Sequence, residues 1–199
     1  MKLAIFALVL LPLVNRAAAA DLIVSARVIN TGHLPDGREA CRVSVDVINE
    51  SQLPVTMYMM TCGWDSSWIV ASPLKLKIAG WNCDKNNLAP YLFLPRRGYS
   101  FQFAVQARET DTHIEGTNLK VGYVCIVSKP RSGSMWSDMD ASHGTMAWSN
   151  EFSVPTLSNH LLSYDGERRE LPNQLLDPAS PSVTPPAGAG GVPSVAADH

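Results

Sequence analysis

The chain has 199 residues, of which 17% are charged, and its formal net charge is −2. A nearly neutral chain with scattered charges lacks the basic surface on which proteins bind nucleic acid or anionic lipid. The composition therefore excludes the polyanion-binding classes and indicates an ordinary globular chain.

The first twenty residues have the pattern of a secretory signal peptide. Lys2 precedes an apolar run over residues 3–14, and small residues follow at 17–20. This pattern predicts cleavage after Ala20, so that the mature chain begins at Asp21. The apolar run is shorter than the roughly 20 residues that span a bilayer, and no second run of this kind follows. We therefore expect an exported protein, secreted or periplasmic, without a transmembrane segment.

Between residues 21 and 157 the chain alternates apolar and polar residues in short runs, which is typical of β-strands. In residues 38–49, for example, Val43, Val45 and Val47 share one face of the predicted strand. No run keeps the helical period over three turns. About seven short strands separated by Gly, Pro and Asn indicate an all-β fold, a two-sheet antiparallel β-sandwich. The predicted strands are residues 22–29, 38–49, 53–60, 74–78, 99–108, 119–127 and 148–154.

The chain after residue 157 has the composition of a flexible tail. From Pro172 to the end it contains six prolines and few large apolar residues. Such a segment buries too little apolar surface to offset its ordering entropy. We expect residues 172–199 to be disordered, and residues 157–171 to form a short helix or no regular structure. The predicted domains are the signal peptide 1–20, the sandwich 21–157 and a Pro/Ala/Gly-rich tail 158–199, which is a passive spacer or a tether.

Four cysteines in an exported chain favour disulfide bonds. Cys62 and Cys83 have 20 residues between them, and a bond there would stabilise the fold by roughly 3 kcal/mol by constraining the unfolded chain. Cys41 and Cys125 would then bond to each other or stay reduced, because four cysteines allow three pairings that the residues alone do not distinguish. A zinc site is excluded, since the sequence has no closely spaced C-x₂₋₄-C pair.

Three short motifs resemble immunoglobulin-like domains, including the fibronectin type III-like domains of bacterial secreted proteins. In VGYVCI, Tyr123 lies two residues before Cys125, which is similar to the tyrosine corner of these domains. WSNEFSV and LFLPRRGYSFQF resemble their last strand and the turn into their fifth strand. The resemblance covers about residues 22–155 and implies an immunoglobulin-like sandwich with a Cys41–Cys125 bridge between its sheets. It implies no particular activity, because such sandwiches serve many unrelated roles.

Two groups of residues are candidates for partner binding. Three tryptophans lie close in sequence to Cys62 and Cys83, namely Trp64, Trp68 and Trp81. They either cover a structural crosslink or present an aromatic surface to a glycan or peptide. Residues 128–147 join the last two predicted strands, and they are long for a connection that usually has about two to five residues. Long loops at the ends of sandwiches commonly hold binding residues. The candidate contacts in this loop are Met135, Trp136 and Asp138, and the loop also carries Met139, Asp140 and His143.

A metal carrier is the alternative function. Met57, Met59, Met60 and Cys62 lie close together in sequence, and soft sulfur ligands suit Cu(I). Methionine also fills gaps in a core, and the alternation places Met57 and Met59 on one face of a strand. The sequence therefore predicts no metal and no cofactor, with a periplasmic copper carrier as the competing hypothesis.

Enzyme function has little support in the sequence. The chain contains no G-x-S-x-G elbow, H-E-x-x-H motif or glycine-rich phosphate loop. Ser132 or Ser134 with Asp138 and His143 could form a triad only on a loop, where nothing fixes its geometry. We therefore predict a non-catalytic exported protein that binds a protein or glycan partner or forms part of the cell envelope. An inhibitor that presents residues 128–147 to an extracellular protease is a third hypothesis.

Overall fold

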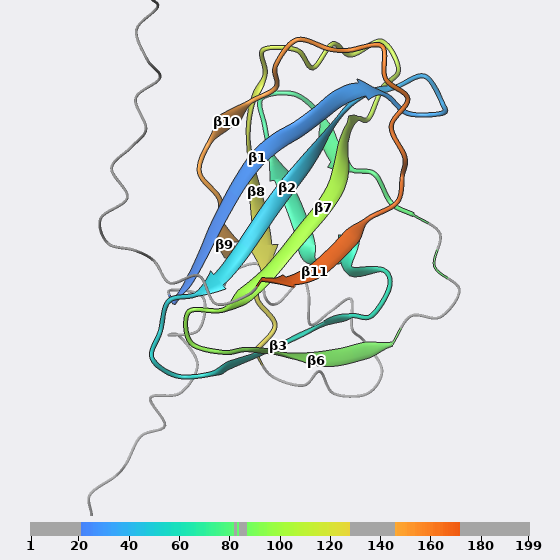
Figure 1. Ribbon diagram of the computed structural model, residues 1–199. Helices are drawn as coiled ribbons and strands as arrows, with labels where there is room; N and C mark the ends of the chain where they lie inside the picture. The colour runs from blue at the N-terminus through green and yellow to red at the C-terminus, as the bar shows by residue number, and fades with distance from the viewer. Residues whose placement is uncertain (1–20, 82, 84–86, 128–145, 172–199) are drawn as a thin grey trace, which may run out of the picture.

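Eleven strands and one short 3₁₀ helix form the part of the chain that the computed structural model describes, residues 21–81, 83, 87–127 and 146–171 (Figure 1). Every pairing between these strands is antiparallel, which confirms the predicted all-β antiparallel fold. The number of strands is larger than the predicted seven. Residues 148–154 take part in two strands, and three further strands lie in segments where no strand was predicted. No helix in these residues is long and apolar enough to cross a membrane.

The largest sheet has the strand order β1–β2–β7–β11. Strand β5 pairs with one end of β7, and β11 pairs with the other end on the same side. We call this the large sheet. Its strands are β1 (Leu22–His33), β2 (Glu39–Asn49), β5 (Leu76–Ile78), β7 (Gly98–Ala107) and β11 (Glu167–Leu171).

A smaller sheet is built around β8, which pairs with β4, β9 and β10. The remaining two strands, β3 and β6, pair only with each other among the described residues, and we call them the ribbon. The 3₁₀ helix η1 (Trp64–Ser67) joins the ribbon strand β3 to β4. The bounds are β3 (Val55–Met60), β4 (Trp68–Ala71), β6 (Leu88–Phe93), β8 (Asn118–Val124), β9 (Met146–Trp148) and β10 (Phe152–Ser153).

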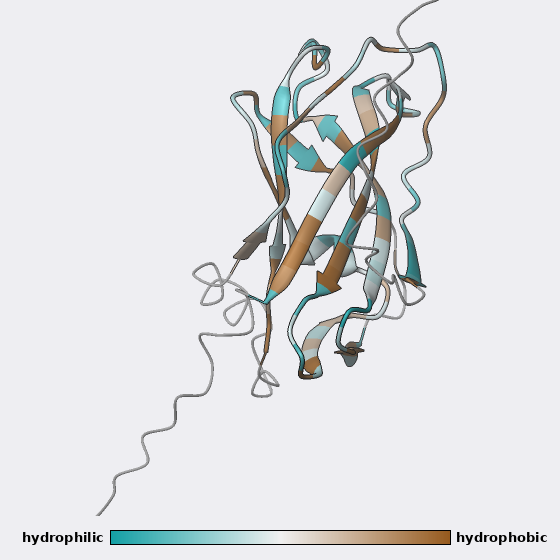
Figure 2. Ribbon diagram, turned by 60° about the vertical axis from the view of Figure 1, so that its left-hand side comes forward, coloured by the Kyte–Doolittle hydropathy of each residue, from teal (hydrophilic) through white to brown (hydrophobic). Residues whose placement is uncertain are grey.

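The large and small sheets pack face to face around an aromatic core. The ring of Trp68 on β4 lies 5.0 Å from that of Phe101 on β7 and 5.0 Å from that of Tyr123 on β8, measured between centroids. All three side chains are buried. Apolar bands alternate with polar ones along the long strands (Figure 2), as expected of strands with one face on a core. The arrangement is that of a β-sandwich, with the ribbon at the lower end in Figure 1.

The boundary predicted at residue 157 is wrong, because the described chain continues in the fold to Leu171. Leu162 is buried, and its N–H donates to the carbonyl oxygen of His33 at 2.8 Å. The segment ERREL then forms β11 against β7. Its charges concealed this strand, because an edge strand gains stability from pairing and uses charged side chains against edge-to-edge association. Residues 1–20 and 172–199, predicted as signal peptide and disordered tail, lie outside the described residues.

The structure contains the predicted Cys62–Cys83 disulfide. The indole N–H of Trp81 donates to the carbonyl oxygen of Cys62 at 3.0 Å, so this tryptophan covers the crosslink. Cys41 and Cys125 are buried thiols, and the bridge between them that the immunoglobulin resemblance implies is therefore not formed. Burial raises the pKa of the Cys41 thiol to about 12 and that of Cys125 to about 12, which keeps both protonated at neutral pH.

The expected tyrosine corner also lacks its hydrogen bond. Tyr123 is fully buried in the core, and its hydroxyl has no hydrogen-bond partner among the described residues. A tyrosine corner is defined by a hydrogen bond from this hydroxyl to the backbone. At this position the tyrosine ring contributes packing against Trp68 and Phe101, while the hydroxyl contributes no hydrogen bond.

Candidate functional site

The tryptophans that the sequence nominated for partner binding belong to the core. Trp64 is 4% exposed and Trp68 is 5% exposed, and the ring of Trp64 lies 4.5 Å from that of Trp81. Neither ring face is open to a ligand, because the 3₁₀ helix and β4 turn both side chains towards Phe101 and Phe103. Trp64 and Trp68, which the sequence offered as partner contacts, are thus core residues in this structure. The other candidates, Met135, Trp136 and Asp138, lie outside the described residues.

Three of the four sulfur atoms that would bind Cu(I) are bonded or buried, and the fourth, that of Met60, belongs to a half-buried residue at the end of β3. Cys62 is bonded to Cys83, and Met57 and Met59 are buried in the core. The guanidinium Nη1 of Arg168 lies 3.8 Å from Sδ of Met59, and a cation at this distance opposes the binding of a metal ion. The described residues also contain no cluster of three or more His, Cys, Asp and Glu side chains placed to hold a metal. The geometry thus offers the copper hypothesis no assembled ligand set.

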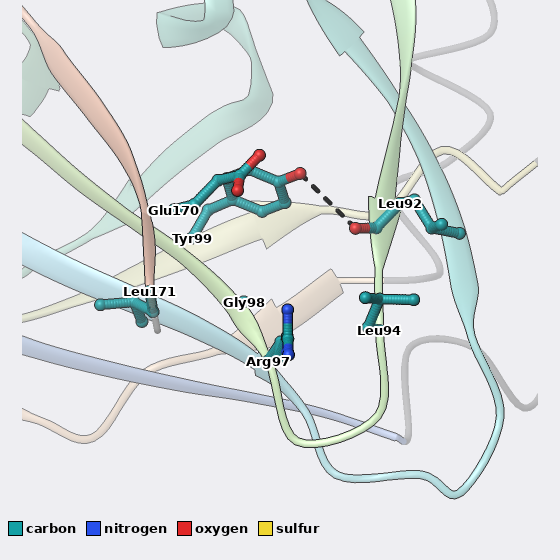
Figure 3. Close-up of a pocket in the computed structure, with 7 residues that line it drawn as sticks. All are labelled: Leu92, Leu94, Arg97, Gly98, Tyr99, Glu170 and Leu171. Atoms are coloured by element: carbon teal, nitrogen blue, oxygen red, sulfur yellow. Dashed lines mark hydrogen bonds between the residues drawn. The ribbon is translucent and has the colours of Figure 1, made fainter. Parts of the chain in front are cut away.

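A hollow of about 240 Å³ lies where three strand ends meet (Figure 3). We call it the β11 hollow. Strand β6 leaves to join the ribbon while β7 enters the large sheet, and the end of β11 closes the angle between them. Its lining combines apolar side chains with one charge of each sign. The lining residues are Leu92, Leu94, Arg97, Gly98, Tyr99, Glu170 and Leu171.

The turn at the base of the hollow is fixed by the buried side chain of Asn49. Its Nδ2 donates to the carbonyl oxygens of Phe93 at 2.9 Å and Leu53 at 2.8 Å. Its backbone oxygen accepts from the N–H of Arg96 at 2.7 Å, and its own N–H donates to the oxygen of Arg97 at 3.0 Å. These bonds hold Arg96 at a φ of 59°, in a left-handed conformation that a free turn would seldom populate. The base of the hollow is therefore preorganised.

Gly98 forms the floor because no larger residue fits there. A Cβ atom at this position would lie 1.7 Å from the carbonyl oxygen of Val47 on β2. The close approach of the two strands brings the start of β7 directly under the hollow. Glycine at this position is therefore required by the close approach of β2 and β7.

Tyr99 and Glu170 are opposite each other in the β7–β11 register and form one wall. The Tyr99 hydroxyl points to the carbonyl oxygen of Leu92 at 3.5 Å, as Figure 3 shows. Burial and then the negative charge of Glu170 raise the pKa of Tyr99, while the charge of Arg168 opposes this shift. The wall therefore presents a neutral phenol beside a carboxylate at neutral pH.

Two strand edges border the hollow. Among the described residues, no strand pairs with the side of β11 that faces away from β7. On the ribbon strand β3, the backbone N–H of Tyr58 donates to the carbonyl oxygen of Ile126 at 2.8 Å, on the side away from β6. The residue opposite Tyr58 on β6 is Pro90, which has no N–H. Alternation along β6 then directs the backbone groups of Leu92 away from β3 as well. The hollow thus lies beside backbone groups suited to pairing with an added strand.

No protein-family model, curated protein or solved structure matches the chain. The site is therefore interpreted from its own geometry. Sequence reasoning missed the residues of the hollow because β6 and β11 were not predicted, and neither segment carries a motif. The one available signal was Leu92 and Leu94 in LFLPRR, where two leucines precede a Pro-Arg-Arg turn.

Proposed function

We propose that the protein is an exported, non-catalytic binding protein that holds an extended segment of a protein partner at the β11 hollow. The observation that carries this proposal is a preorganised hollow, lined by leucines and by one charge of each sign, directly beside an unpaired strand edge. Leu92 at its rim is 51% exposed, so its side chain is accessible to a bound segment. Extended peptides bind in this manner when they add a strand to a sheet edge and place side chains in adjacent pockets.

The lining suits a peptide better than a glycan. Sugars stack on open aromatic faces, but the Tyr99 ring is packed edge-on against Tyr91 and Phe93, at centroid distances of 5.9 and 4.8 Å. The lining combines the side chains of Leu92, Leu94 and Leu171 with the polar groups of Arg97 and Glu170. The leucines favour the apolar residues of a polypeptide, and the two charged groups favour its polar ones.

Charge at the hollow would set the orientation of the bound segment. Arg97 lies on the β6–β7 turn and Glu170 lies on β11, on opposite sides of the hollow (Figure 3). A partner segment with an acidic residue near Arg97 and a basic residue near Glu170 would therefore be favoured over the reverse order. We infer a partner segment in which apolar residues alternate with charged ones, as in an edge strand.

The disulfide supports export. The Cys62–Cys83 bond is of a kind that forms and persists in oxidising compartments such as the periplasm or the extracellular space. A secreted or periplasmic location agrees with this bond and with the signal-peptide pattern of the sequence.

Panning of random peptides displayed on phage against the disulfide-bonded chain from Asp21 onwards tests the proposal. Selected peptides are then measured by calorimetry against the parent protein, Leu92→Glu and Leu161→Glu. Leu161 is 75% exposed and lies beside His33, at the other end of the large sheet, so its variant is a matched control. Introducing a carboxylate at the rim should weaken peptide binding by about tenfold or more, because it removes an apolar contact and adds charge.

The expected outcome is loss of binding with Leu92→Glu and unchanged binding with Leu161→Glu, together with peptide-induced NMR shifts in the amides of Glu170 and Leu171. The proposal is overturned when no peptide is selected, or when the two variants bind the selected peptides equally well. A glycan array probed with the same three proteins distinguishes a glycan partner from a peptide partner. A glycan partner requires a sugar that binds the parent protein and binds Leu92→Glu more weakly.

A further inference from the structure

A second hollow, of about 230 Å³, lies on the outer face of the large sheet where β7 and β11 run side by side. We call it the Ser100 hollow. The register places Ser100 opposite Arg169 and Gln102 opposite Glu167, so these four side chains share one face of the sheet. Tyr99 and Glu170 alternate onto the other face. The Ser100 hollow is therefore distinct from the wall that those two residues form, and inferences about it do not depend on the proposed peptide function.

The floor of this hollow is a buried hydroxyl without a hydrogen bond. Ser100 is 1% exposed, and its Oγ has no hydrogen-bond partner within the described chain. Ser44, which lies on the same face of the neighbouring strand β2, is buried in the same condition. A buried hydroxyl without a hydrogen bond destabilises the fold, because it has lost its bonds to water without replacement. A ligand in the hollow that supplies the missing partner removes this penalty.

The charges around the hollow leave one cation uncompensated. Glu167 accepts from Nη2 of Arg42 at 3.1 Å. Asp46, the register partner of Ser100 on β2, lies 3.5 Å from Nη1 of Arg27. Arg169, in contrast, is exposed and forms no ion pair with any residue that the structure describes. With both carboxylates paired, the remaining charge at the hollow is positive.

We propose that the Ser100 hollow binds an oxyanion group, held by the guanidinium of Arg169 and the hydroxyl of Ser100. The planar guanidinium donates two parallel hydrogen bonds to a carboxylate, phosphate or sulfate. Ser100 donates from the floor, and the amide of Gln102 lines the same space. The backbone of the Arg168–Arg169 segment completes the wall. The oxyanion is a terminal group of a larger ligand or a small free anion, since all share this chemistry.

Titration of the ¹⁵N-labelled, disulfide-bonded chain with sodium acetate, sodium phosphate or sodium sulfate tests the site, with sodium chloride keeping the ionic strength constant. The site predicts saturable shifts of the Ser100 and Arg169 amides with at least one of the three anions. Acetate binding alone identifies a carboxylate ligand, and phosphate or sulfate binding alone identifies a tetrahedral oxyanion. Shifts that rise linearly without saturation for all three anions overturn the proposal.

Three variants separate the site from general surface charge. Arg169→Gln should weaken anion binding by about tenfold or more, because it removes charge-assisted hydrogen bonds to the anion. Arg108→Gln removes an exposed cation just beyond the end of β7, outside the hollow, and should leave binding unchanged. Ser100→Ala should weaken binding while the melting temperature stays the same or rises, since the unsatisfied hydroxyl is gone. Equal losses for the two arginine variants, or unchanged binding with Ser100→Ala, contradict the assignment.

Discussion

The guanidinium carbon of Arg168 lies 4.3 Å from the centroid of the Tyr91 ring. Arg168 belongs to β11 in the large sheet and Tyr91 belongs to β6 in the ribbon, so this cation–π contact joins the two parts that enclose the β11 hollow. Nη1 of the same arginine also lies 3.8 Å from Sδ of Met59 on β3. Arg168 therefore links β11 to both strands of the ribbon, in addition to the packing of Met57, Met59 and Phe93 in the core.

Replacement of Arg168 by alanine should loosen the ribbon from β11. We expect a loss of about 1 kcal/mol in the free energy of unfolding, because a partly buried cation–π contact contributes about 0.5–2 kcal/mol. Urea denaturation followed by tryptophan fluorescence measures the change. Arg169→Ala removes an exposed neighbour on the same strand and serves as the control, with an expected change within about 0.5 kcal/mol. Equal losses for the two variants would show that β11 is held by its backbone pairing alone.

The Cys62–Cys83 bond should supply a large part of the stability of the loop that it closes. A double variant with serine at both positions should lose about 3 kcal/mol in the free energy of unfolding. The crosslink joins cysteines with a sequence separation of 21 and so constrains the unfolded chain. Denaturation of the parent protein with and without dithiothreitol provides the comparison. Reductant should destabilise the parent protein by a similar amount and leave the double variant unchanged, whereas an effect on the double variant would indicate a second bond.

The buried thiols should make the fold sensitive to alkaline pH. The pKa of Cys41 and that of Cys125 are raised from 9.0 to about 12 by burial. As the pH rises above about 9, the unfolded chain releases these protons while the folded chain retains them. The free energy of unfolding should therefore fall between about pH 9 and pH 12, by up to roughly 1.4 kcal/mol per pH unit for each thiol.

Denaturation at pH 7.5 and pH 10.5 measures this fall, and the variant Cys41→Ala is the matched comparison. Its free energy of unfolding should depend less steeply on pH than that of the parent protein, whatever its stability at neutral pH. In denaturant without reductant, a thiol reagent should react with two thiols per chain, those of Cys41 and Cys125. If no thiol reacts, the Cys41–Cys125 bridge that the resemblance implied is present.

The sequence predicted those parts of the fold in which one face of a strand is apolar. Val43, Val45 and Val47 alternate with polar residues and lie in the core as expected. The Cys62–Cys83 spacing indicated the crosslink that is present. Both inferences depend on local regularities, the two-residue period of a strand and the length of a loop, which can be read without knowledge of the tertiary structure.

The sequence failed where tertiary pairing outweighs the local pattern. Strand β11, with the sequence ERREL, carries no apolar alternation and forms because β7 offers an unpaired edge. The residues alone did not decide whether Trp64 and Trp68 cover the crosslink or present an aromatic surface, and the 3₁₀ helix and β4 place both in the core. Both hollows lie along β11, so an error in one strand removed both of them from the sequence-based prediction.

The unpartnered hydroxyl of Tyr123 gives the sharpest test of the immunoglobulin resemblance. In a tyrosine corner this hydroxyl donates a hydrogen bond to the backbone, and its removal should cost about 1 kcal/mol. In the present structure the hydroxyl is buried without a partner in the described chain, and burial raises the pKa of Tyr123 well above its ordinary value.

Tyr123→Phe keeps the ring contacts with Trp68 and Phe101 and removes only the unsatisfied oxygen. We therefore expect its free energy of unfolding to rise by about 1 kcal/mol, measured by urea denaturation at pH 7.5. Tyr58→Phe, at a half-buried tyrosine in the ribbon, is the control and should change stability little. A loss of stability with Tyr123→Phe would mean that the hydroxyl has a backbone partner in solution, and it would restore the tyrosine corner.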